Sequence, residues 1–207
     1  SCTSVDRLQR QMGLTDRGYN LVLTVDGVIC DLDVVRRACE RGFEVIVSDH
    51  HLPGTDLPEA DGICAATVEG CPSPHLAGVG VAFILMAAVN SYLVKQGRER
   101  VDIRPLLDLV ALGTLADVSN LAGHNRILVK NGLPILCEAR RPGVAALKAS
   151  GNLAPHAALS AGLVASTLAP PIYAAPRMGH RGLALRPLPP EARYQAAAHA
   201  APRLYTS

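Results

Sequence analysis

The chain has 207 residues and a formal net charge of +2, and its apolar residues are mostly aliphatic, with no tryptophan and two phenylalanines. This length allows one sizeable core with room for a smaller appendage. The near-neutral charge excludes a strong overall field that would draw in nucleic acid. The six cysteines form no Cys-x-x-Cys pair, so we expect free thiols and a cytoplasmic location.

The aliphatic composition is typical of an α/β fold in which helices flank a parallel sheet. We expect residues 19–150 to form this domain, after a polar segment over 1–18. Residues 151–207 are rich in alanine and proline and have no sustained period, which predicts a loosely ordered tail or the remnant of a link to a missing second domain. No stretch is expected to span a membrane, and the amino terminus lacks the regions of a signal peptide.

Two apolar, β-branched runs near the amino terminus each end in an acid. Residues 21–25 lead into Asp26, and residues 45–48 lead into Asp49. Between them, residues 31–42 have the pattern of an amphipathic helix, with Asp31 at its N-cap and a glycine at its end. A strand, a helix and a strand in so short a span predict two parallel strands joined by a right-handed crossover.

The carboxyl ends of parallel strands share one edge of the sheet, where ligands of open α/β folds bind. Asp26 and Asp49 should therefore lie near each other, together with His50 and His51. Carboxylate and imidazole ligands suit Mn²⁺, Fe²⁺ or Zn²⁺, and Mg²⁺ where oxygen ligands dominate. The alternative interpretation makes Asp49 the cap of a turn, with two half-exposed histidines beside it.

Residues 53–74 are punctuated by proline and glycine and predict a loop region after this edge. A helix is expected to begin at Gly78 and Gly80 and to run through Leu93. Glycines at a helix start could let a phosphate approach backbone amides, and close helix packing explains them equally well.

A third acid follows the apolar segment from Pro105 to Leu112, which predicts a helix that is buried on nearly all sides. A break at Gly113 and Thr114 is expected to end this segment before Asp117. Asp117 is either a third ligand for a cation or an ordinary helix cap or turn residue.

Four segments in this order resemble the DHH phosphoesterase superfamily, and within it they are most similar to the RecJ family of single-strand-specific DNA exonucleases. The segments are Thr24–Asp26, Val45–Pro53, Leu76–Phe83 and Leu107–Val118. The resemblance continues through Asn125–Leu133 and Arg141–Val144, covers roughly residues 17–148, and has a fainter echo at 169–179.

The resemblance implies a metal-dependent phosphodiesterase that hydrolyses single-stranded DNA from an end, in DNA repair and recombination. It implies a two-metal site for Mn²⁺ or Mg²⁺, in which two cations hold the attacking and leaving oxygens. The implied metal ligands are Asp26, Asp49, His50 and Asp117. The implied catalytic residues are Asp49, His50 and His51, with His51 near the scissile phosphate, and the implied substrate-binding residues are Gly78, Gly80, Arg126 and Arg177.

The chain also departs from the family pattern. The family's first motif, Asp-x-Asp, has no counterpart before Asp26, and Pro171 and Tyr173 stand where an arginine and an asparagine are usual. We therefore expect one cation to be held and a second to be held poorly. Loss of one such preorganised contact lowers a rate by ~10²–10³, so slow hydrolysis is expected.

Two other functions remain open from the residues alone. One is a phosphodiesterase of the same superfamily for small nucleotides or oligonucleotides, which would use the same ligands. The other is a non-catalytic DHH scaffold, which the absent first motif favours. The expected partners are single-stranded DNA and replication or repair proteins, with no membrane association and with the chain as a monomer.

Overall fold

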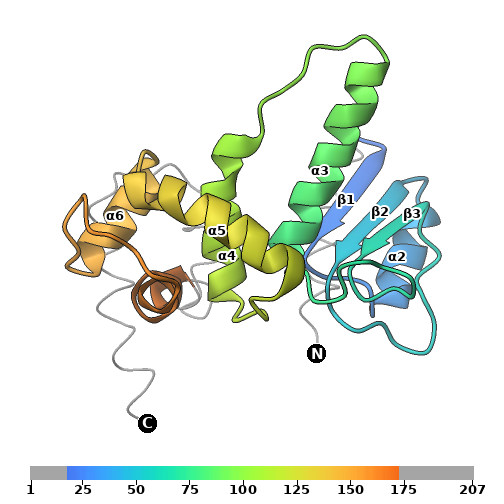
Figure 1. Ribbon diagram of the computed structural model, residues 1–207. Helices are drawn as coiled ribbons and strands as arrows, with labels where there is room; N and C mark the ends of the chain where they lie inside the picture. Colours follow the sequence, from blue (N-terminus) through green and yellow to red (C-terminus); the bar gives the residue numbers. More distant parts are fainter. Residues whose placement is uncertain (1–17, 173–207) are drawn as a thin grey trace. The chain divides into compact units, whose positions relative to one another are not determined.

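The computed structural model describes residues 18–172, which divide into two compact units (Figure 1). Of the described residues, the first unit holds 18–101 and 122–124, and the second holds 102–121 and 125–172. The first unit contains the sheet, and the second is built from helices. This is the expected α/β class, a parallel sheet flanked by helices.

Three parallel strands form the sheet in the order β1-β2-β3: β1 (Leu21–Val25), β2 (Glu44–Asp49) and β3 (Gly62–Ala65). The predicted pairing of the first two is confirmed, because Val25 lies opposite Ser48. The Asp26 N–H continues the ladder by donating to the Ser48 carbonyl at 2.9 Å.

The expectation of an uninterrupted loop over 53–74 is wrong, because β3 lies within it. This strand has only four residues, Gly-Ile-Cys-Ala, and none of them is fully buried. So short an apolar run gives no periodic signal. It becomes a strand because β2 offers it hydrogen-bonding partners, with Ile63 opposite Val47.

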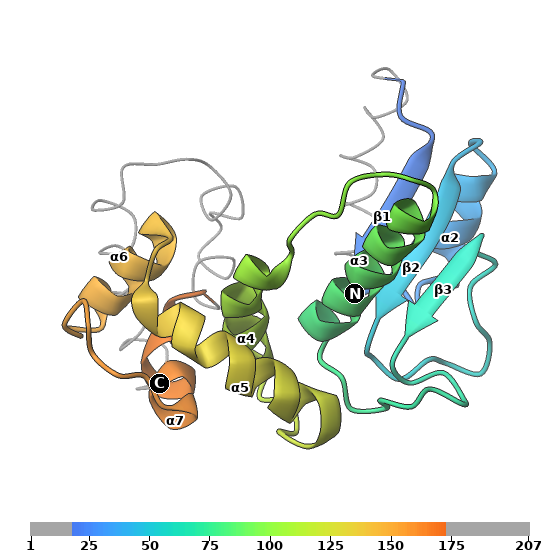
Figure 2. The same cartoon turned by 45° about the horizontal axis from the view of Figure 1, so that its top comes forward.

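The two helices of the first unit, α2 (Leu32–Cys39) and α3 (Gly78–Lys95), cover opposite faces of the sheet (Figure 2). Asp31 stands at the N-cap of α2 as expected, although its side chain makes no capping hydrogen bond. The face beneath α2 forms a core of six buried residues: Ile29, Val35, Ala38, Phe43, Val45 and Val47. This packing holds the ends of β1 and β2 in register.

Helix α3 begins at Gly78 as predicted and contacts all three strands. By length and composition alone it could cross a membrane, since its 18 residues have a mean hydropathy of 1.6 and 17% of them are buried. The expectation that no stretch has such a length and composition is therefore wrong. Core helices of soluble proteins pass the same test.

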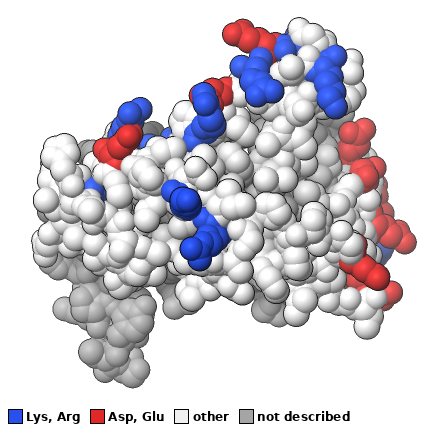
Figure 3. Space-filling view, in the orientation of Figure 1, with Lys and Arg blue, Asp and Glu red and all other residues white. Residues whose placement is uncertain are grey.

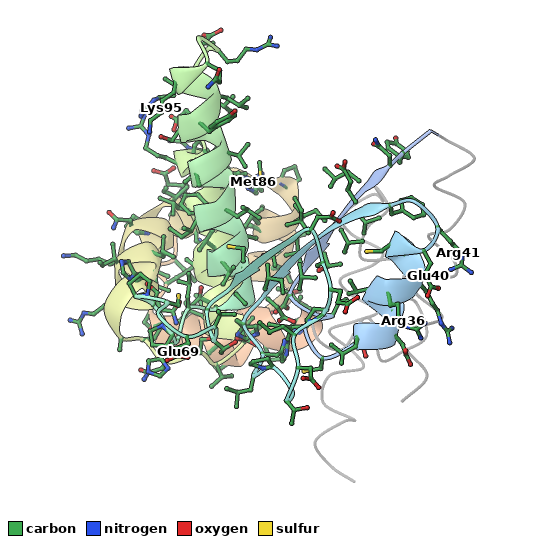
Figure 4. All side chains as sticks on the ribbon, turned by 90° about the vertical axis from the view of Figure 1, so that its right-hand side faces the viewer. Arg36, Glu40, Arg41, Glu69, Met86 and Lys95 are labelled. Atoms are coloured by element: carbon green, nitrogen blue, oxygen red, sulfur yellow. The ribbon has the colours of Figure 1, made fainter. Side chains whose placement is uncertain are left out.

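Figure 4 shows Met86 part-way along α3 and Lys95 at its far end.

The second unit begins with the 3₁₀ turn η2 (Arg104–Leu106), which leads into α4 (Leu107–Ala116). It continues with α5 (Gly123–Glu138), α6 (Pro142–Ser150), α7 (Ala161–Leu163) and the π-helical turn η3 (Val164–Leu168). Its core includes Leu112, Leu136, Leu147 and Leu168. Helices α4 and α5 approach closely at Gly132, where a Cβ would overlap the Leu107 carbonyl oxygen.

Two expectations about this unit need correction. The predicted break at Gly113 and Thr114 is wrong, because α4 runs through both residues to Ala116. Burial of the helix outweighs the low helix propensity of one glycine, which is about 1 kcal/mol. Residues 161–172, expected in the loose tail, are helical, and Val164 and Leu168 lie fully buried in the core. The five cysteines within 18–172 are free thiols, and a cytoplasmic location stays a prediction.

Candidate metal centre

The site begins where β1 ends, at a backbone that L-residues rarely adopt. Asp26 has a φ of 60° and Val28 has a φ of 83°. A positive φ is unusual for any residue other than glycine and is a clear outlier for a β-branched one. Each such residue costs about 1–3 kcal/mol, and these residues concentrate at functional sites. The turn directs the Asp26 side chain toward the end of β2.

The Asp26 carboxylate meets the first of the two histidines that follow β2. His50 Nε2 lies 3.1 Å from Asp26 Oδ1. The His51 ring stands edge-on to the His50 ring, with centroids 4.5 Å apart. Asp26, His50 and His51 can each offer one ligand atom within 4.8 Å of the others, and no second such group of three occurs within residues 18–172.

Asp49 is the last residue of β2 and is 1% exposed. Its Oδ1 accepts from the backbone N–H groups of His50 and His51, at 2.7 and 3.1 Å, and lies 2.7 Å from His51 Nδ1. Its Oδ2 accepts from the Ile29 N–H at 3.0 Å. Burial alone would raise the pKa of the Asp49 carboxyl, but the hydrogen bonds from His51, Ile29 and His50 together hold that pKa below its usual value.

Gly78, the first residue of α3, lies directly against the Asp26 carboxylate. A Cβ at this position would overlap Asp26 Oδ1 and lie 2.7 Å from Asp26 Cγ. Gly80, two positions further along the same turn, is also buried. A glycine is therefore required at position 78, because the Asp26 side chain occupies the space that a Cβ would need. The sequence did not reveal this reason.

The other predicted site residues lie elsewhere in the chain. Asp117 is in the second unit, exposed at the C-cap of α4, where its Oδ2 accepts from Ser119 Oγ at 2.5 Å. Arg126 is exposed on α5 in the same unit. Arg177 lies outside the described residues. The structure thus brings Asp26, Asp49, His50, His51 and Gly78 together in the first unit.

Charge on the first unit is unevenly distributed (Figure 3). Acidic side chains gather on the side that carries α2, where Asp33 and Glu40 both pair with Arg36 at 2.7 and 3.0 Å. Figure 4 shows Arg36, Glu40 and Arg41 together at that helix. Basic side chains gather at the far end of α3, where Lys95, Arg98 and Arg100 are exposed.

A carboxylate and two imidazoles, at the carboxyl end of parallel strands, form a donor set that suits a first-row divalent cation. Comparison with known protein families identifies the family of this chain. Residues 3–114 match the model of the DHH family, N-terminal domain, which is more than half of the chain. The chain belongs to the DHH family.

Curated relatives in this family are much longer than the chain. The single-stranded-DNA-specific exonuclease RecJ of Salmonella typhimurium is 44% identical over 172 residues, which are 78% of this chain and 30% of the relative. The RecJ of Escherichia coli is 46% identical over 145 residues, or 66% of this chain and 25% of the relative. The chain therefore spans less than a third of the length of these relatives.

Among solved structures, the chain is similar to a crystal structure of exonuclease RecJ bound to manganese. That similarity has a TM-score of 0.71 at 35% identity and covers 89% of this chain and 46% of the other. The predicted resemblance to the RecJ group of DHH proteins is confirmed by these matches. The manganese and the single-stranded DNA are named for these relatives, and their relevance to this chain is a matter for the proposal below.

Proposed function

We propose that this chain is part of a divalent-metal-dependent phosphodiesterase that hydrolyses single-stranded DNA from an end. The observation that carries the proposal is the cluster of Asp26, His50 and His51 at the end of the sheet. The kinship with RecJ supports the substrate class, because the curated relatives are named as single-stranded-DNA-specific exonucleases. The manganese-bound relative supports the choice of cation.

The residues present fit a cation in three respects. Asp26 and His50 already approach within 3.1 Å of each other, so a cation can replace this direct contact with two coordinate bonds. Gly78 keeps the space beside the carboxylate clear of any side chain. The unfavourable backbone conformation of Asp26 is of the kind that concentrates at ligand-binding sites. We propose Asp26 and His50 as ligands, and the ligand role of Asp117 stays a prediction from the sequence.

A divalent cation held there would polarise a phosphoryl oxygen and promote attack by water. The side chains supply the rest of the chemistry. The Asp26 carboxylate and the His50 imidazole would hold the charge at a fixed place, and the His51 ring lies beside them, near the place where a phosphate would bind. The basic end of α3 favours an anionic strand, because its exposed cations outnumber its acids.

The test is a cleavage assay with Mn²⁺ and a long single strand that carries a different fluorophore at each end. We expect terminal nucleotides to be released slowly, and a matched duplex to be cleaved much less. Asp26→Asn, which keeps the side-chain shape and removes the charge, should abolish the release. Asp61→Asn is the matched control, because Asp61 accepts the Val45 N–H at 2.7 Å within the same unit and lies outside the cluster.

Equal rates for the wild type and Asp26→Asn would overturn the assignment of the site. Preference for a dinucleotide over the long strand would overturn the assignment of the substrate class and leave the metal centre standing. The first outcome therefore tests the metal site, and the second tests the length of the substrate.

A further inference from the structure

Asp49 uses both of its carboxylate oxygens within the protein. Oδ1 accepts from the N–H groups of His50 and His51 and contacts His51 Nδ1, while Oδ2 accepts from the Ile29 N–H. Three of these four contacts fall on Oδ1, which exceeds its two lone-pair sites, and one falls on Oδ2. The side chain is also 1% exposed. Asp49 is therefore poorly placed to bind a cation directly.

The contact with His51 fixes which ring nitrogen carries a proton. Oδ1 already accepts two backbone N–H groups, so the carboxylate acts as an acceptor and His51 Nδ1 must be the donor. In a neutral imidazole with its proton on Nδ1, Nε2 carries the lone pair. The 2.7 Å contact thus sets both the tautomer and the direction of the ring.

The His51 backbone is held from a second side. Thr67, in the loop after β3, donates from Oγ1 to the His51 carbonyl at 2.7 Å. Thr67 and Asp49 therefore fix the main chain on both sides of the His51 Cα, while the ring itself remains 58% exposed. An exposed ring that is held so firmly is suited to act on a bound ligand.

We propose that Asp49 is a positioning residue, which orients His51 and presents its Nε2 lone pair to the cation, in place of the metal-ligand role predicted from the sequence. The proposal rests on the proposed function for its purpose, because His51 needs a ligand to act on. Carboxylates hold metal-binding histidines in this manner in many metal sites. The structural part of the proposal can be tested without metal or substrate.

The test is ¹⁵N NMR of the histidine side chains in the metal-free chain, at a pH where the imidazoles are neutral. We expect His51 to be predominantly the Nδ1–H tautomer in the wild type. In Asp49→Asn the side-chain amide competes as a donor, so the population should shift to a mixture in which Nε2–H dominates. Asp61→Asn, which removes another carboxylate that accepts a strand N–H, should leave the His51 tautomer unchanged.

A wild-type His51 in the Nε2–H form would overturn the proposal, and this measurement does not depend on any variant folding. An unchanged tautomer in folded Asp49→Asn would also overturn it, as would the same shift in Asp61→Asn. Failure of the cleavage assay would leave the tautomer result intact, so the two proposals fail separately.

Discussion

At the residue scale, Asp26 combines a rare backbone conformation with a carboxylate that lies close to two distant parts of the chain. Its φ is 60°, and its carboxylate lies between Gly78 and His50 Nε2. Neither neighbour is close in sequence, so the sheet and the start of α3 must both be in place before the side chain is fixed. Because Gly78 lies against the Asp26 carboxylate, adding a single methyl group at this position tests whether the carboxylate binds metal.

We predict that Gly78→Ala displaces the Asp26 carboxylate and weakens Mn²⁺ binding by about 10–100-fold, the usual effect of disturbing a ligand through its neighbour. The methyl group would overlap Asp26 Oδ1, so the carboxylate must move away from its place beside His50. Calorimetric titration measures the loss, and circular dichroism checks that the fold is kept. Gly54→Ala is the matched control, because a Cβ there meets nothing within 4 Å. Equal affinities for the two variants would contradict the account.

The sequence could predict the acids and histidines of the site because each follows an apolar run. Asp26 and Asp49 end two strands of a βαβ unit, and this pattern alone brings them to one edge. It could not predict that Asp49 turns inward to His51 and Ile29, because the direction of a side chain at a strand end depends on the turn that packs against it. The role of Gly78 was hidden for a similar reason, since it depends on a carboxylate more than 50 positions away.

At the element scale, a buried lysine ties together the end of α5 and the segment after α6. Lys148 is 1% exposed, and its Nζ donates to the carbonyl oxygens of Cys137, Pro155 and Ala157 at 3.0, 2.5 and 3.2 Å. Each of the three donor positions of the ammonium group is thus used. These bonds satisfy carbonyls that no helix would otherwise satisfy.

We predict that Lys148→Met lowers the free energy of unfolding of the second unit by about 3 kcal/mol. Methionine keeps the volume but leaves three partly buried carbonyls without a donor. Hydrogen bonds to a charged group are worth about 1.5–3 kcal/mol each, and part of their sum is offset because the ammonium charge is no longer buried. Urea unfolding followed by far-UV circular dichroism measures the change. Lys130→Met on the exposed face of α5 is the control and should change stability by less than about 0.5 kcal/mol. A loss no larger than that of Lys130→Met would show that the hydrogen bonds of Lys148 do not stabilise the second unit.

Element boundaries were predictable where a local pattern exists and not where tertiary contacts decide. Helix α3 begins at Gly78 as its apolar run and its glycines indicate. Strand β3 was missed because four weakly apolar residues become a strand only beside β2. The helical turns through Leu168 were missed because their two residues in the buried cluster, Val164 and Leu168, are too few to show a helical period. They pack with residues of α4, α5 and α6.

At the scale of the whole molecule, the chain consists of two compact units and spans less than a third of its curated relatives. The first unit holds the Asp26, His50 and His51 cluster, and the second holds Asp117. The proposed ligands Asp26 and His50 therefore both belong to the first unit.

Binding of a divalent cation by Asp26 and His50 can be measured by calorimetric titration of the chain with Mn²⁺. We predict saturable uptake of one Mn²⁺ by the wild type. Asp26→Asn and His50→Ala should abolish this uptake, and His156→Ala in the second unit should leave it unchanged. No uptake by the folded wild type, or uptake that persists unchanged in both Asp26→Asn and His50→Ala, would contradict the claim.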